Sequence, residues 1–278
     1  ASDEEVMPGK LGRLPDEYRT SSLIFLGNIN TNRAMVNLYV RYKCFTDADY
    51  PGGNGYELRT VINPYTRGNN LIVLGGSSLE GVGRAVNRLV SEIGKNGQPG
   101  QVVLPFLLEI DIEPSLKKRL DDYPYTDLDA PKPGMSTMQG YEIMRVVGHY
   151  SLMYAVTGDR RYGEYGAECL RVFSNHHTDS YGDRHYFIER LLIGFYWLQA
   201  GGFFSDEEVV RMDRLMLGTL VKAQDNWWRR KDGNIPLGHR HHSKGTYEFL
   251  LLARFIKENA DISAEAFAQC EQWIRECQ

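Results

Sequence analysis

The spacing of apolar residues changes near residue 135, and this change constrains the fold more than any other feature of the chain. Before that point, short apolar runs of strand length alternate with helical segments, whereas every periodic segment after it has helical spacing. The sequence therefore predicts an α+β protein with two domains. We expect a small α/β domain over 18–115, a linker rich in Pro and Asp over 116–134, and an all-α array of helical hairpins over 135–278.

The first domain contains apolar runs of strand length. Strands are predicted at 22–27, 55–63, 70–75 and 102–112. The run at 70–75 is apolar on both faces and is therefore expected at the centre of the sheet. Pro105 interrupts the last run, which favours a position at the sheet edge because proline cannot donate a backbone hydrogen bond.

Helices are expected in both domains. In the first, they are predicted over 30–43 and over 77–94, and the second of these begins with a capping box formed by Ser77 and Glu80. The second domain is expected to hold about six helices, at 139–156, 161–173, 189–199, 206–224, 245–258 and 264–277. Short connections alternate with long ones in this series, which is typical of paired antiparallel helices.

The segment 225–255 collects residue types that a protein core does not require. Its basic side chains crowd together at His239, Arg240, His241, His242 and Lys244. Neighbouring cations repel one another unless solvent or an anionic partner is present. We therefore interpret the segment as a site for a negatively charged ligand. The alternative is a basic, solvated loop whose tryptophans fill the core.

The side chains of this segment offer several kinds of chemistry. Trp227 and Trp228 present flat apolar faces with one polar N–H each, which suit stacking on a sugar ring. His241 and His242 titrate near neutral pH and could transfer a proton. The helical spacing over 246–256 places these histidines in a loop just ahead of a buried helix. A metal held by the histidines is an alternative, although no carboxylate partner stands at a clear spacing.

A second polar cluster occupies 174–190, between two predicted helices. It includes Asn175, His176, Arg184 and Tyr186. Functional residues commonly lie in such loops, so this cluster is expected to face the same cleft as 225–255 if both loops lie at one end of the helical array. The alternative is a polar loop whose Asp and Asn residues cap the next helix.

Composition argues against some partners and locations. A net charge of −4 and a pI of about 6.0 do not favour a general surface for nucleic acid or anionic membrane. No apolar run reaches the roughly 18 residues of a membrane span. The opening ASDEEVMPGK lacks a leader, as in a mature form whose secretion signal has been removed, so we expect a secreted or periplasmic protein. The four cysteines lack metal-finger spacing and are expected mostly as buried free thiols.

Two stretches of the first domain resemble a known accessory domain. GYELRTVI, followed by NNLIVLGGSSLEGVGRAVNRLVSEI, is similar to the non-catalytic α/β domain that precedes the catalytic domain of β-N-acetylhexosaminidases and α-glucuronidases. The resemblance covers about forty residues of strand, Gly-Gly-Ser and helix. It implies a carbohydrate-active protein whose catalytic residues lie elsewhere in the chain.

The helical half resembles a family of carbohydrate-cleaving enzymes. QDNWW, followed by GNIPLGHRHHSKGTYEFLLLARF, is similar to the catalytic region of the (α/α)-toroid polysaccharide lyases, such as the chondroitin and heparin lyases. This resemblance implies β-elimination on an anionic polysaccharide or oligosaccharide that contains uronic acid, without a cofactor. The helical array is then expected to be part of an (α/α) toroid.

The lyase resemblance also implies roles for particular residues. Neutralising the substrate carboxylate is assigned to Asn175 and Arg240, the base to His241 or His242, and the general acid to Tyr186 or Tyr247. The residues expected to bind substrate are Trp227, Trp228, Arg240, Asn226, His176 and Arg184.

Other readings of the helical half stay open. A complete toroid has more helices than the six or so predicted, and the chain ends inside an amphipathic segment, which favours the N-terminal part of a longer enzyme. A glycoside hydrolase on the same scaffold would need two carboxylates, for which the candidates are Asp179, Asp183, Glu189 and Asp232. A glycan-binding module without catalysis is the third reading.

Overall fold

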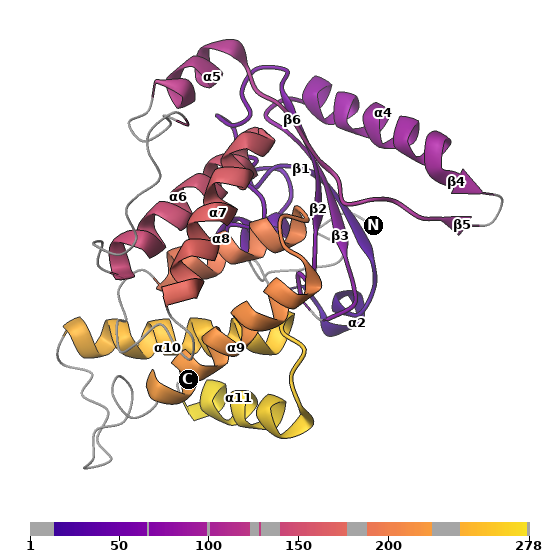
Figure 1. The fold of residues 1–278 in the computed structure, drawn as a ribbon. Helices are drawn as coiled ribbons and strands as arrows, with labels where there is room; N and C mark the ends of the chain where they lie inside the picture. The colour runs from indigo at the N-terminus through magenta and orange to yellow at the C-terminus, as the bar shows by residue number, and fades with distance from the viewer. Residues whose placement is uncertain are drawn as a thin grey trace. The chain divides into compact units, whose positions relative to one another are not determined.

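The computed structural model describes residues 14–65, 67–98, 101–122, 128, 140–176, 188–223 and 240–276. Within these ranges, the side chains of 97–98, 101–102, 140–142, 176, 223 and 240–244 are not described. The chain divides into two compact units (Figure 1). Unit 1 comprises Ala1–Thr126 and Ala155–Gly158, and unit 2 comprises Asp127–Tyr154 and Asp159–Gln278. The coarse prediction of an α+β protein is confirmed.

Unit 1 is built on a mixed four-stranded sheet of order β1-β3-β2-β6. Its strands are β1 (Leu23–Gly27), β2 (Tyr56–Val61), β3 (Leu71–Gly76) and β6 (Leu108–Asp111). β1 pairs with β3 in parallel, while β2 pairs with β3 and β6 in antiparallel. The inner position of β3 and the edge position of β6 are as predicted. A short pair, β4 (Gly97–Gln98) and β5 (Gln101–Val102), forms a separate sheet, so 102–112 is not one continuous strand.

The helices of unit 1 differ from the predicted ones. They are α2 (Asp16–Arg19), α3 (Met35–Tyr39), α4 (Leu79–Asn96) and α5 (Pro114–Asp121). The helix predicted over 30–43 is reduced to α3, because the side chains of Asn28 and Asn32 accept backbone N–H groups two residues ahead and stabilise turns instead. Helix α5 occupies part of the predicted linker, with Glu113 capping its first N–H groups.

The cap of α4 is also one residue away from the predicted position. Ser78 Oγ accepts the N–H of Gly81 at 3.1 Å and is the N-cap. Ser77 Oγ instead accepts the N–H of Gly52 at 3.0 Å, and the Glu80 carboxylate accepts a bond from Asn54 at 2.8 Å. The predicted capping box of Ser77 and Glu80 is therefore wrong, because both side chains bind the neighbouring Gly52–Asn54 turn.

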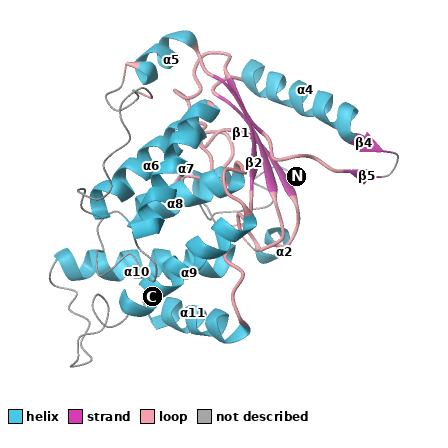
Figure 2. Cartoon of the chain, viewed as in Figure 1, coloured by secondary structure: helices cyan, strands magenta, loops and turns pink. Residues whose placement is uncertain are grey.

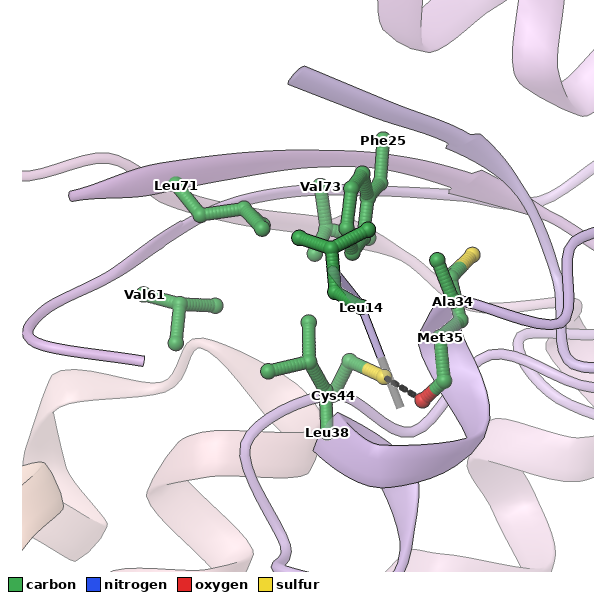
Figure 3. Packing of buried hydrophobic residues seen from close by; sticks show 9 residues of the cluster. All are labelled: Leu14, Phe25, Ala34, Met35, Leu38, Cys44, Val61, Leu71 and Val73. Atoms are coloured by element: carbon green, nitrogen blue, oxygen red, sulfur yellow. Dashed lines mark hydrogen bonds between the residues drawn. The ribbon is translucent and has the colours of Figure 1, made fainter. Parts of the chain in front are cut away.

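Buried apolar residues cover both faces of the sheet. On one face, Tyr56, Leu58 and Leu74 pack against α4. Figure 3 shows the other cluster, in which the thiol of Cys44 lies 3.8 Å from the carbonyl oxygen of Met35. Its members are Leu14, Phe25, Ala34, Met35, Leu38, Cys44, Val61, Leu71 and Val73. The sheet of unit 1 is therefore buried on two sides, as expected for an α/β domain.

In the described part of unit 2, every regular element is a helix (Figure 2). Its six helices are α6 (Gly140–Thr157), α7 (Arg160–His176), α8 (Ile188–Ala200), α9 (Asp206–Ala223), α10 (Arg240–Asn259) and α11 (Ala264–Glu276). They correspond to the six predicted helices. Short connections at 158–159, 201–205 and 260–263 alternate with the longer segments 177–187 and 224–239, which confirms the predicted alternation.

Helices α6 and α8 pack side by side through glycines. A Cβ atom added at Gly148 would lie 2.7 Å from Cβ of Arg190, and one added at Gly194 would lie 3.1 Å from Oγ of Ser151. Close approach of the two backbones therefore requires glycine at these points. The contacts advance in the same direction along both helices, so α6 and α8 run in the same sense.

The same relation holds for the next helices. Glu189 bonds to Glu248, and the rings of Phe195 and Phe255 lie 6.1 Å apart, so α8 and α10 also run in the same sense. Contacts of α7 with α9 advance together as well, from Arg171–Glu208 to the Asn175–Arg211 hydrogen bond. Helices α6, α8 and α10 therefore form one row, and α7 and α9 form a second. The C-terminal ends of α7 and α9 precede the segments 177–187 and 224–239 in the chain, and the N-terminal ends of α8 and α10 follow them.

Candidate functional site

Helix α10 begins earlier than the sequence pattern indicated. It starts at Arg240, so His241 and His242 lie in its first turn and not in a loop ahead of it. Gly245, where the predicted helix began, is buried inside the regular helix. The side chains of 240–244 are outside the description, and so is the whole of 224–239 with Asn226, Trp227 and Trp228.

The second polar cluster begins at the C-terminal end of α7. Asn175 is exposed in the last turn of this helix, and its Oδ1 accepts a hydrogen bond of 3.0 Å from Nη1 of Arg211 on α9. His176 is the last residue of α7, but its side chain lies outside the description, as do Arg184 and Tyr186 in 177–187. The structure therefore pairs Asn175 with an arginine that the sequence pattern did not single out.

A buried glutamate in α10 contacts the start of α8. Glu248 on α10 has no exposed surface, and its Oε2 accepts the backbone N–H of Glu189 at 2.8 Å. Glu189 is the second residue of α8, whose first N–H groups have no partner within the helix. A carboxylate at a helix N-terminus is favoured by these N–H groups and by the helix dipole. Glu248 therefore ties α10 to the N-terminus of α8.

Sequence reasoning missed Glu248 because it treated 246–256 as an apolar helix. The available signal was a single acidic residue inside TYEFLLLARF, seven positions after His241. Seven residues are nearly two full helical turns, so Glu248 and His241 occupy the same face of α10. Charged residues are rarely fully buried unless a partner accompanies them, so an acidic residue in such a run indicates a specific contact.

The N-terminus of α8 is set back from its neighbours. Gly148 of α6 lies against Arg190, and eight residues of α6 precede that contact. On the other side, eight residues of α10 precede Glu248. Arg190 and Glu189 are the third and second residues of α8. At 1.5 Å per residue, the starts of α6 and α10 therefore extend about 9–10 Å beyond the start of α8.

Tyr247 and Asn175 are the predicted site residues whose side chains the structure describes. The side chain of Tyr247 is exposed, with 48% of the surface of the residue accessible. Asn175 is likewise exposed, at the end of the rows where 177–187 leaves α7.

The α7–α9 contact also contains an ion pair between Arg171 and Glu208, next to the hydrogen bond between Asn175 and Arg211. Arg171 Nε donates to Oε1 of Glu208 at 2.6 Å. This hydrogen bond raises the pKa of Arg171 and lowers the pKa of the Glu208 carboxyl. Arg171 Nη2 also donates to the carbonyl of Phe203 at 2.6 Å. Arg171 therefore holds α7 against the start of α9 through an ion pair and a backbone contact.

Unit 1 contains a second group of buried charges, which the sequence pattern did not indicate. Glu57 and Arg59 form an ion pair with no exposed surface, and Thr46 Oγ1 donates to Glu57 at 3.0 Å. Arg59 also donates to the carbonyl of Ala155, and the Tyr50 hydroxyl donates to Val156 at 2.5 Å. These carbonyls end α6, where a helix attracts cations and donors. The cluster has a structural explanation as a cap of this helix end.

Packing also explains the glycines between β3 and α4. A Cβ atom added at Gly75 would lie 2.2 Å from Oγ1 of Thr46, and one added at Gly76 would lie 2.6 Å from the backbone nitrogen of Val82. Neither position has room for a side chain. The Gly-Gly-Ser pattern is therefore required by the close approach of strand, turn and helix.

The described residues include histidine, cysteine and acidic side chains outside these clusters. Among them, no group of three or more His, Cys, Asp or Glu side chains could hold a metal ion. Cys44, Cys169 and Cys270 are buried free thiols, as predicted. Burial raises the pKa of Cys270 to about 11. None of the described helices combines the length and apolarity that a membrane span requires.

Comparison with known proteins identified no similar protein. A scan against protein-family models found no match, and searches of curated proteins and of solved structures found none either.

Proposed function

We propose that this chain is a polysaccharide lyase of the (α/α)-toroid kind, acting on uronic-acid-containing glycans outside the cytoplasm. The observation that carries the proposal is the hydrogen bond between Glu248 Oε2 and the N–H of Glu189. It joins the helices that follow 177–187 and 224–239, the two segments richest in predicted site residues. Residues distant in sequence can then act on one substrate.

The arrangement of helices supports the same proposal. Two rows of parallel helices joined alternately by short turns and long segments are the architecture of an (α/α) array. The two long segments separate consecutive helices in the chain, and segments of this kind commonly carry function. An elongated glycan could contact several such segments at once.

The proposed reaction needs three functions from the side chains. Asn175 and Arg240 neutralise the carboxylate, which makes the C5 proton removable by His241 or His242. The electrons of that C–H bond form the C4–C5 double bond as the C4–O bond breaks. Tyr247 or Tyr186 returns a proton to the leaving oxygen, and Trp227 and Trp228 hold sugar rings.

A glycoside hydrolase is the second candidate, and one observation favours it. Glu248 and Glu189 place two carboxyl-bearing residues on adjacent helices, in direct contact through the Glu189 backbone. Glycosidases use two carboxylates about 5–10 Å apart. The lyase is preferred because the Glu248 carboxylate already accepts a structural hydrogen bond at the start of α8.

The test uses chondroitin sulfate, hyaluronan, heparin and alginate as substrates. A lyase produces ultraviolet-absorbing unsaturated uronate, whereas a hydrolase produces new reducing ends without that absorbance. We expect absorbance with at least one polymer, reduced roughly 100- to 10,000-fold by His241→Ala or His242→Ala. Gln269→Ala, an exposed change on α11, is the control that should retain activity.

Each other outcome rejects the lyase proposal in a different way. Reducing ends without absorbance would identify the hydrolase, and Glu248→Gln should then abolish turnover. Retention on immobilised polymer without any product would identify a glycan-binding module. A folded protein that neither retains nor cleaves any of the four polymers would leave no support for a function on acidic glycans.

A further inference from the structure

The α7–α9 contact contains two arginines that are held in different ways. Arg171 is neutralised by Glu208 at 2.6 Å and also stands over the ring of Phe204, 5.5 Å from its centroid. Arg211 lies one turn further along the same contact. Its described hydrogen bond goes to the neutral amide of Asn175, at 3.0 Å.

The charge of Arg211 is not compensated by its described surroundings. Among the residues that the structure describes, no carboxylate forms an ion pair with Arg211, and its buried Nε has no hydrogen-bond partner. A guanidinium carries five N–H donors in a planar fork. The Asn175 bond uses one of them, so the arrangement orients the group without neutralising it.

The position of this pair matches the proposed substrate side. Asn175 is exposed and precedes the last residue of α7, at the end of the rows where 177–187 begins. The C-terminal carbonyls of α7 attract a cation, which would explain an arginine nearby as a purely structural feature. That structural explanation accounts for the positive charge of Arg211 and for its contact with α7. It does not account for the Nε donor that has no hydrogen-bond partner.

We propose that Arg211, oriented by Asn175, binds the carboxylate of an acidic sugar. This inference rests on the proposed function and adds a binding residue to it. The planar fork of arginine matches a carboxylate in bidentate geometry, and the terminal Nη donors that the Asn175 bond does not use are suited to this contact. A sulfate group offers the same oxyanion chemistry and is the other source that the test must separate.

The test follows the Arg211 side chain directly by nitrogen-15 NMR of arginine Nε–H groups. Sodium glucuronate, glucose 6-sulfate and glucose are titrated at constant ionic strength into the full chain. We expect glucuronate to shift the Arg211 resonance, identified by its loss in Arg211→Lys, while glucose leaves it unchanged. A response to glucose 6-sulfate alone would overturn the carboxylate assignment in favour of sulfate.

Two substitutions separate binding from a structural role. Arg211→Gln should weaken binding of a uronate oligosaccharide roughly 10- to 100-fold, the range for a hydrogen bond to a charged group. It should have no effect on binding of the carboxyl-reduced oligosaccharide. Asn175→Asp supplies a carboxylate that pairs with Arg211, so it should preserve the helix contact and thermal stability but lose the glucuronate response.

A control variant and two outcomes separate this inference from the lyase proposal. Arg160→Gln removes one positive charge at the opposite end of α7 and should leave uronate binding unchanged. Equal weakening of the intact and reduced oligosaccharides by Arg211→Gln would show a structural role and reject the inference. Polymer cleavage with an unresponsive Arg211 would reject this inference alone, while a glucuronate response without cleavage would reject only the lyase.

Discussion

Replacement of Glu248 tests the contact that brings the two site-bearing helices together. Glu248→Ala removes the acceptor of the Glu189 N–H and one buried methylene group. The hydrogen bond to a charged group is worth about 1.5–3 kcal/mol, and the methylene about 0.8 kcal/mol. We therefore expect the free energy of unfolding to fall by about 2–4 kcal/mol. Glu248→Gln keeps an acceptor oxygen and should cost only about 1 kcal/mol.

Tryptophan fluorescence in urea measures this loss where it occurs. All four tryptophans of the chain belong to unit 2. Trp197 is fully buried on α8, and Trp273 lies 5.5 Å from the ring of Phe249, the neighbour of Glu248. Hydrogen exchange of the Glu189 amide provides a local readout of the same contact. A Glu248→Ala protein with unchanged stability and an equally protected Glu189 amide would refute the reasoning.

Two further predictions concern unit 1. Arg59→Met leaves the buried Glu57 carboxylate without its ion-pair partner and should destabilise β2 by about 3–5 kcal/mol. Adding Glu57→Leu should restore most of that lost stability. Hydrogen exchange of β2 amides measures both effects, with α10 amides as the internal control. The hydrogen bond to Asp47 raises the pKa of Tyr39 to about 12, and burial with a bond to Glu109 raises that of Tyr56 to about 12. Because unfolded phenols ionise near pH 10 while these stay neutral, their stabilising effect is complete below pH 10 and is lost between pH 10 and 12. Thermal unfolding followed by circular dichroism should show this loss, and Tyr39→Phe should reduce it; an identical pH dependence in that variant would contradict the assignment.

Local patterns predicted the elements but not all of their ends. The six helices of unit 2 follow from apolar residues at helical spacing, a signal that each segment carries by itself. The start of α10 was not predicted correctly. Gly245 suggests a helix boundary in the sequence, but in the structure it is buried inside the regular helix. The cap of α4 was also misplaced, because two adjacent serines are equivalent locally and the Gly52–Asn54 turn distinguishes them.

The candidate site was predictable as a set of segments and not as a set of contacts. Clusters of histidine, arginine and tryptophan stand out because a core excludes such groupings. Arg211 and Glu248 did not stand out, since a single charge on a predicted helix is usually solvated. Their significance comes from partners 36 and 59 residues away in the chain.

The sequence by itself determined the division into an α/β half and a helical half, the six helices in the described part of the second half and the segments that carry reactive side chains. These properties depend on residue type and short-range spacing. The tertiary structure decided that alternate helices run in the same sense, that Glu248 caps α8 and that Asn175 orients Arg211. Such choices depend on which backbones can approach closely and which buried polar groups can be satisfied, and both are set by residues far apart in the chain.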